Sequence, residues 1–374
     1  MRLSITALLN AKVELLGDCT LTSVDRMLTN NQIEIIFPTA GPIWRPDQTK
    51  KNRPDTPEGF ALQFTEYFTP LLGKVVQQKA PRISVQMALF ENPDMNAFAG
   101  GSDQLGFVIG TYKGLIETLL AYYYNKQNQV FVSQKFPLMS KLSPDTLSLY
   151  SCFFATTYIF FHEFSHVFRG HLGYRSTLGI NGSQILEVNA WSGGSQSDRQ
   201  IYLTECDADI YGGRFTAAAM LEQLPSLIRE ISCVDETALR SEILSFCAFS
   251  IQSLFRLFET TQLQADPHYP PHRVRSAIVL TQLVRGLKRM QLGRHGSTPQ
   301  STSHEIVSGI RWSNELADIR KLREFPVDAG AAADDWEKKD APDVTALSRK
   351  IAPYRPGISG LRRFLLTIRG WIPF

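Results

Sequence analysis

The spacing of hydrophobic and polar positions along this chain predicts a mostly helical protein. Aromatic and aliphatic residues recur every three or four positions in long segments, the pattern of a helix that buries one face. Phe60, Phe64, Phe68 and Leu72 follow one another at this spacing. Helices are predicted over 58–78, 114–124, 144–170, 198–221, 224–261 and 272–291.

Two of these helices have recognisable start signals. Ser143 precedes Pro144 and Asp145, which combines a serine cap, a proline at the first helical position and an acid in the first turn. Ser197 and Gln200 have the spacing of a capping box, which predicts that another helix begins directly after Ser197.

Shorter β-prone segments predict a small β-sheet. Arg82 to Phe90 and Leu105 to Thr111 are the two main candidates, and Ile33 to Phe37 is a third possible strand. Pro38 to Pro57 is rich in proline and charged residues and is predicted to be an exposed loop. The fold class predicted is α+β and mostly helical, with a sheet from residues 83–111 packed on the most apolar helix.

Composition and charge narrow the possible functions. The 374 residues are 43% hydrophobic, enough for a sizeable core, and the net charge is only +3. The first 270 residues show none of the basic stripes expected of a nucleic-acid-binding protein. Five widely spaced cysteines without a CxxC motif favour a reducing compartment, so we expect a cytoplasmic protein without a secretory signal. The longest apolar run, Leu147 to Phe161, is shorter than the roughly 20 residues that span a bilayer.

Changes in composition divide the chain into three predicted parts. Residues 1–80 form an N-terminal segment packed on the core, 81–292 form the core, and 293–374 form a polar linker and a C-terminal appendage. Residues 361–374 mix basic and bulky apolar side chains, so they could bind peripherally to an anionic membrane or to a protein partner. The alternative is that this tail packs on its own domain.

The chemistry of the chain is concentrated in an HExxH motif. His162 and His166 are four residues apart, so on a helix both imidazoles lie on one face and can bind one metal ion. Glu163 projects from the same region and can accept a proton from a water molecule that the metal activates. The motif falls at the end of the predicted apolar helix, where unpaired imidazoles would be costly. It therefore predicts one zinc ion per chain.

A catalytic zinc site needs a third protein ligand. His171 lies nine residues after His162, one short of the extended HExxHxxGxxH pattern, and is rejected as a ligand. Glu205 is preferred, because Asp209 lies four residues later on the same helix face and can orient a ligating imidazole. Glu187 is a rival ligand in an irregular segment. Of the neighbouring residues, Asp207 is expected on a solvated helix face and Cys206 in the core.

Two further segments become relevant once the motif is accepted. The strand from Arg82 to Phe90 could pair with the backbone of a substrate peptide by β-addition. In the segment from His268 to Arg273, the prolines predict a rigid turn before a helix. His268 or Tyr269 could then stabilise an oxyanion, although a helix-start turn with surface histidines is an equally good interpretation.

The order of these motifs resembles the gluzincin peptidases related to HtpX and the CAAX prenyl protease. The matching segments are Asn92–Gly101 with Gly114–Ile116, Phe161–His166 with Gly170–His171, Glu205–Asp209, and the weaker His268–Arg273. The chain also resembles the phage-exclusion protease Lit, in which a hydrophobic helix likewise precedes the HExxH motif directly. The resemblance covers roughly residues 80–290.

The resemblance implies a zincin-like core and a role for several residues. It implies that Glu205 is the third zinc ligand and that Asp209 lies behind a ligand. It also implies that Asn96, Ala97 and Phe98 contact substrate and that the substrate is a protein or peptide.

The combined prediction is a zinc-dependent endopeptidase, in which zinc activates water and Glu163 is the general base. The alternative is a zinc-binding regulatory or sensor module on the same fold, with little or no turnover.

Overall fold

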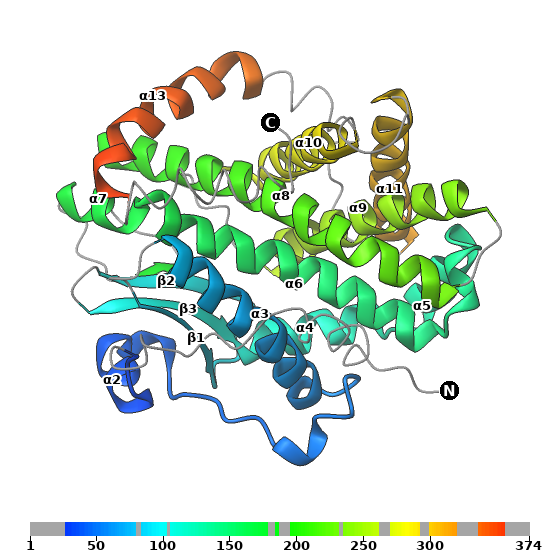
Figure 1. Ribbon diagram of the computed structural model, residues 1–374, viewed down its shortest axis with the longest axis horizontal. Coiled ribbons are helices and arrows are strands. Elements are labelled where there is room, and N and C mark those ends of the chain that lie inside the picture. Colours follow the sequence, from blue (N-terminus) through cyan, green and yellow to red (C-terminus); the bar gives the residue numbers. More distant parts are fainter. Residues whose placement is uncertain are drawn as a thin grey trace.

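The sheet and one long central helix, α6 (Pro144–Arg169), organise the fold (Figure 1). The computed structural model describes residues 27–79, 84–102, 105–178, 184–186, 195–231, 235–261, 270–291, 299–319 and 336–355. Within these ranges the chain is a mostly helical α+β protein, as the sequence predicts. Its other α-helices are α2 (Asn30–Ile36), α3 (Pro57–Lys79), α4 (Lys113–Tyr123), α5 (Lys126–Lys135), α7 (His171–Thr177), α8 (Ser195–Ile231), α9 (Glu236–Thr261), α10 (His272–Gln291), α11 (Pro299–Ile319) and α13 (Ala341–Ile351).

Helix α6 begins and ends where its sequence signals predict. The hydroxyl of Ser143 accepts a hydrogen bond from the backbone N–H of Thr146 at 3.1 Å. Gly170 ends the helix in the left-handed conformation with φ of 80°, which glycine adopts without strain. Every residue from 147 to 169 is buried, so the long apolar run of the sequence forms the core of the protein.

The sheet has the strand order β1-β3-β2-β4. β1 (Val85–Phe90) is parallel to β3 (Gly106–Tyr112), whereas β2 (Ala97–Ser102) is antiparallel to both β3 and β4 (Gln184–Leu186). The strands predicted over 82–90 and 105–111 are therefore confirmed, with no end more than three residues from its predicted position. β2 and β4 were not predicted, because their glycine-rich and short sequences have little β-propensity.

The two faces of the sheet pack against different helices. Successive side chains of a strand point to opposite faces, and in β2 the small Ala97 and Ala99 lie in the clusters formed with α6 and α7. Phe98, between them, belongs to the cluster on the other face, where its ring centroid lies 5.3 Å from that of Phe37. Figure 1 shows α2 on that face of the sheet and α6 on the opposite face.

The prediction of a strand over 33–37 is wrong, because this segment belongs to α2. Thr29 caps the helix, and Gln32 completes a capping box with it. Ile33 and Phe37 are four residues apart, so both bury on the same side against the sheet. A short run of β-branched residues has no preference that outweighs a cap and a helical burial pattern.

Several other boundaries also differ from the prediction. The break predicted between 221 and 224 lies inside α8, which continues to Ile231, and α9 begins only at Glu236. Ser197 is not an N-cap, because α8 already begins at Ser195. The part predicted as a polar linker and C-terminal appendage, 293–374, includes α11, which begins at Pro299 and packs along α9. Further on, α13 packs on α8, with Val344 and Leu347 buried.

Glycine residues bring α8 into close contact with its neighbours. A Cβ atom at Gly212 would lie 3.2 Å from the Cα atom of His162 on α6. A Cβ atom at Gly213 would lie 2.8 Å from the carbonyl oxygen of Val279 on α10. Two successive glycines therefore let α8 lie tightly between α6 and α10, and this position brings its acidic residues to the HExxH motif.

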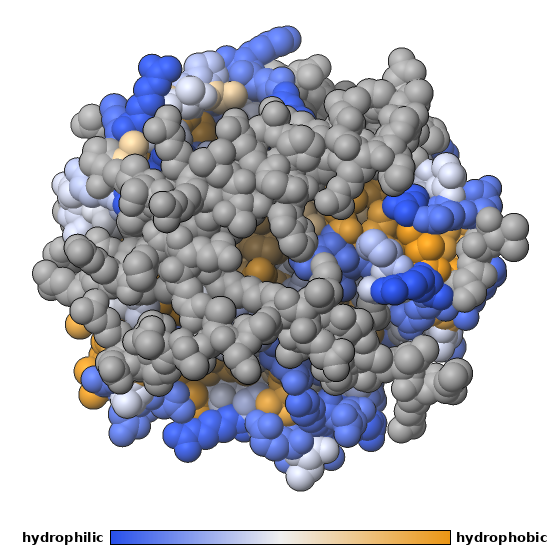
Figure 2. Space-filling model, in the orientation of Figure 1, coloured by the Kyte–Doolittle hydropathy of each residue, from blue (hydrophilic) through white to orange (hydrophobic). Residues whose placement is uncertain are grey.

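The described surface mixes hydrophilic and hydrophobic residues. In the face drawn in Figure 2, hydrophilic residues are most frequent along the lower rim, with smaller apolar areas between them. Among the residues described here, no helix has both the length and the apolar character that a membrane span requires.

Candidate metal centre

The two histidines of the HExxH motif face one another in the interior. His162 and His166 lie one turn apart on α6, and their Nε2 atoms are 3.1 Å apart. Both side chains are fully buried. Burial lowers the pKa of His166 to about 3, an effect that outweighs the opposing charge of Glu205. The imidazole is therefore neutral near pH 7, the form that binds a metal ion.

Glu205 joins these two imidazoles from α8. Its Oε2 atom lies 3.3 Å from Nε2 of His162 and 3.5 Å from Nε2 of His166. One ligand atom from each of the three residues lies within 4.8 Å of the others, so this buried group could hold a metal ion. Neither carboxylate oxygen of Glu205 has a hydrogen bond of good geometry. A buried carboxylate in this state is costly unless a cation compensates it, so the donor set fits a metal ion.

Asp209 lies behind His162. One of its oxygens, Oδ1, lies 2.8 Å from Nδ1 of His162 and accepts a 2.7 Å hydrogen bond from the hydroxyl of Tyr158. Arg275 on α10 donates to both oxygens, at 2.9 and 3.0 Å. Burial alone would raise the pKa of Asp209, but the charge of Arg275 and the contacts with His162 lower it to about 2. Asp209 is therefore an anion that orients His162, the position expected for it from the sequence.

A second buried carboxylate, that of Asp207, is connected to His166 through the imidazole of His171. Nδ1 of His171 is 3.0 Å from Nδ1 of His166, and Nε2 of His171 is 2.9 Å from Oδ2 of Asp207. Arg169 donates to both oxygens of Asp207, at 2.7 and 3.2 Å. Burial would raise the pKa of Asp207, yet its contacts with His171 and Arg169 hold that pKa well below the usual value.

The expectation that Asp207 is solvated is therefore wrong, because its face of α8 packs against Arg169 and His171 and Asp207 is only 2% exposed. Cys206 is buried in the core, as expected. His171 takes no part in the group of three possible ligands, which agrees with its rejection from the spacing.

Glu163 and Arg175 complete the described surroundings of the site. Glu163 follows His162 on α6 and is fully buried. A guanidinium nitrogen of Arg175 on α7 lies 3.9 Å from Oε1 of Glu205, whereas the two imidazoles lie near Oε2. Arg175 thus compensates part of the charge of Glu205 and leaves Oε2 directed at His162 and His166.

The other residues selected from the sequence lie elsewhere. Asn96 is buried just before β2, where its side chain accepts a hydrogen bond from the backbone N–H of Ala97. Ala97 is on the α6 face of the sheet and Phe98 on the opposite face, so the structure does not bring Phe98 to the metal centre. His268, Tyr269, Glu187 and the tail 361–374 lie outside the described residues.

Four residues of the site were not predicted from the sequence: Tyr158, Arg169, Arg175 and Arg275. Tyr158 is four residues before His162, so the helical spacing alone could have placed it beside that imidazole. Arg275 is separated from Asp209 by 66 positions, and no local pattern relates them. Their contact results from the packing of α10 against α8.

Comparison of this chain with protein-family models, with curated proteins and with solved structures finds no match.

Proposed function

We propose that this chain is a zinc-dependent endopeptidase of the gluzincin type, related to HtpX and the CAAX prenyl protease. The observation that supports the proposal is the convergence of His162, His166 and Glu205 from α6 and α8 on one buried point. Two neutral imidazoles and one carboxylate are the ligand set of catalytic zinc sites that keep one position open.

Each residue of the site has a separate role in the proposed reaction. His162, His166 and Glu205 would hold the metal ion, and Asp209 orients His162. When bound, zinc supplies Lewis acidity, which lowers the pKa of a water molecule and polarises a carbonyl group. Glu163 would accept the proton of the attacking water and deliver it to the amine that leaves. Because the whole site is buried, these charges would act in a medium of low dielectric constant.

The test of the general base is Glu163→Gln. We expect this variant to bind zinc like the parent and to lose peptide hydrolysis by a factor on the order of 10²–10⁴. Zinc content is measured by elemental analysis and hydrolysis with a library of quenched fluorescent peptides. Glu117→Gln, an exposed substitution on α4, is the matched control and should keep full activity. An active Glu163→Gln variant would refute the assignment of the base.

The third ligand is tested separately by Glu205→Ala. Removing one of three protein ligands should lower the affinity for zinc by a factor of at least about 100. Competition with a chromophoric chelator measures the change, and circular dichroism checks that the variant is folded. A Glu205→Ala variant that holds one equivalent of zinc as tightly as the parent would show that Glu205 is not a ligand.

A zinc-binding regulatory or sensor module is the second candidate function. It is favoured by the complete burial of His162, Glu163, His166 and Glu205, since a catalytic site must admit its substrate. The same peptide library separates the two functions. Zinc-loaded parent protein that cleaves no peptide, while Glu205→Ala loses zinc, would favour the regulatory module.

A further inference from the structure

We propose that His171 and Asp207 are positioning residues that fix the tautomer of His166 so that its Nε2 atom is free to bind metal. This inference rests on the proposed metal site, and it adds a second orienting chain to the one that Asp209 provides. The chain runs from Nδ1 of His166 to Nδ1 of His171, at 3.0 Å, and from Nε2 of His171 to Oδ2 of Asp207, at 2.9 Å.

The direction of these hydrogen bonds follows from counting protons. The Asp207 carboxylate can only accept, so the proton of neutral His171 is on Nε2 and its Nδ1 is an acceptor. Only one proton fits between the two Nδ1 atoms, so His166 supplies it. A neutral His166 with its proton on Nδ1 has a lone pair on Nε2, the atom that faces Glu205 and His162.

Burial supports the neutral forms that this count requires. His166 and His171 are both fully buried, where a charged imidazole would be costly. A doubly protonated His171 would direct a second proton at His166 and would leave a charge in the interior. The neutral chain satisfies both ring nitrogens of His171 without either cost.

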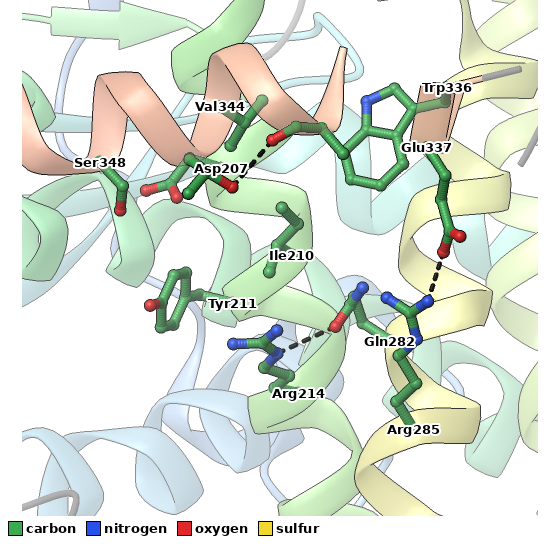
Figure 3. A pocket seen from close by; sticks show the side chains of 12 residues that line it. Asp207, Ile210, Tyr211, Arg214, Gln282, Arg285, Trp336, Glu337, Val344 and Ser348 are labelled. Atoms are coloured by element: carbon green, nitrogen blue, oxygen red, sulfur yellow. Dashed lines mark hydrogen bonds and ion pairs between the residues drawn. The ribbon is translucent and has the colours of Figure 1, made fainter. Parts of the chain in front are cut away.

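Asp207 is itself held in place at the wall of a cavity. Arg169 of α6 binds both of its oxygens, and the guanidinium stacks 4.1 Å from the ring centre of Tyr211. Figure 3 shows Asp207 and Tyr211 along the wall of this cavity, which has a volume of about 390 Å³ between α8, α10 and α13. The orienting chain is thus anchored to α6, the helix that carries His166.

An alternative role for these residues is purely structural. Arg169 and Asp207 would then form a buried ion pair, and the ring of His171 would only fill space in the core. The two roles differ in what each substitution does. His171→Phe keeps the ring volume but removes the acceptor for His166. Arg169→Met removes the ion pair with Asp207 but leaves the acceptor nitrogen of His171 in place, so it is the matched control. His171→Gln restores an acceptor and is the conservative variant.

The experiment measures the tautomer of His166 by ¹⁵N NMR in the chelator-treated full-length protein, and then its affinity for zinc. We expect the proton of His166 on Nδ1 in the parent protein. In His171→Phe it should move to Nε2, and the affinity for zinc should fall by about 10- to 100-fold. Arg169→Met should keep the parent tautomer, and His171→Gln should recover part of the affinity.

Several outcomes would overturn the inference. These are a parent protein with the proton of His166 on Nε2, a His171→Phe variant with unchanged tautomer, and an Arg169→Met variant that loses as much affinity as His171→Phe. If His171→Phe does not fold, the position of the His166 proton in the parent protein, measured by ¹⁵N NMR, is sufficient to test the inference. A parent protein that binds no zinc would refute the proposed function, whereas the tautomer would still test the orienting chain.

Discussion

The two imidazoles of the candidate metal centre are supported in different ways. His162 contacts the carboxylate of Asp209 directly, at 2.8 Å, whereas His166 reaches the carboxylate of Asp207 only through His171. Each carboxylate is bound by one buried arginine, Arg275 in the first case and Arg169 in the second. Both imidazoles are therefore supported by a carboxylate that an arginine binds, but only His166 has another imidazole between itself and the carboxylate.

Helix geometry explains the difference. Residues four apart on a helix share a face, so Glu205 and Asp209 both point from α8 toward α6. Asp207 is two positions from each of them, so it points about 160° away from them around the helix axis. It cannot contact His166 directly, and the imidazole of His171, at the start of α7, bridges the distance. The face of α8 on which a carboxylate lies therefore decides, more than its residue type, whether it supports a metal ligand directly.

The largest expected effect comes from removing the direct carboxylate. Asp209→Ala leaves Arg275 buried without its anion, which should lower the free energy of unfolding by about 3–5 kcal/mol. Urea denaturation of the chelator-treated protein measures the change. The double variant Asp209→Ala with Arg275→Met should recover part of the loss, because no unpaired charge remains. A single variant within about 1 kcal/mol of the parent would contradict this role of Asp209.

A smaller effect is expected from the hydroxyl of Tyr158, which donates to Asp209 on the His162 side. Tyr158→Phe removes the 2.7 Å hydrogen bond to Asp209 and keeps the packing of the ring. Because the bond is to a charged group, its loss should lower the free energy of unfolding by about 1.5 kcal/mol. Urea denaturation again measures the change. The contact between the ring at position 158 and Phe255 should persist in the variant, because phenylalanine keeps the ring. A loss as large as that of Asp209→Ala would mean that Tyr158 has a further role in the fold.

The smallest effect concerns acid pH and His272, the first residue of α10, the helix that also carries Arg275. Burial, with a contribution from Arg275, lowers the pKa of His272 to about 3. In the unfolded chain this pKa is about 6.5, so the unfolded state binds the proton first and stability falls as the pH decreases from about 6.5 toward 3. Since His272 is only partly buried, we expect a contribution of about 1 kcal/mol between pH 6.5 and 5.

His272→Phe is the variant that tests this contribution. Its ring can keep the stacking on Phe258, whose centroid lies 5.7 Å away, and it has no proton to bind. The difference in the free energy of unfolding between parent and variant should therefore change in favour of the variant as the pH falls from 6.5 to 5. A difference that is independent of pH over this interval would exclude His272 as a source of acid sensitivity.

The features of the fold and site that could be predicted from the sequence are those set by residues only a few positions apart in the chain. The start of α6 at Ser143, its end at Gly170 and the pairing of His162 with His166 all follow from spacing along one helix. The preference for Glu205 with Asp209 as its companion also rested on a separation of four, and the structure places both beside the imidazoles. The small strands β2 and β4 escaped prediction, since their pairing partners rather than their residues define them.

The sequence alone specified most of the long helices, the capped start of α6 and the residues that could bind a metal, because local backbone preferences and burial periodicity act over a few residues. Only the tertiary structure decided that Asp207 is buried, that Arg275 binds Asp209 and that His171 connects His166 with Asp207. These contacts join residues 36 to 66 positions apart, except the short step from His166 to His171. They depend on how closely α8 packs between α6 and α10, which the glycines at 212 and 213 permit but which no local pattern specifies.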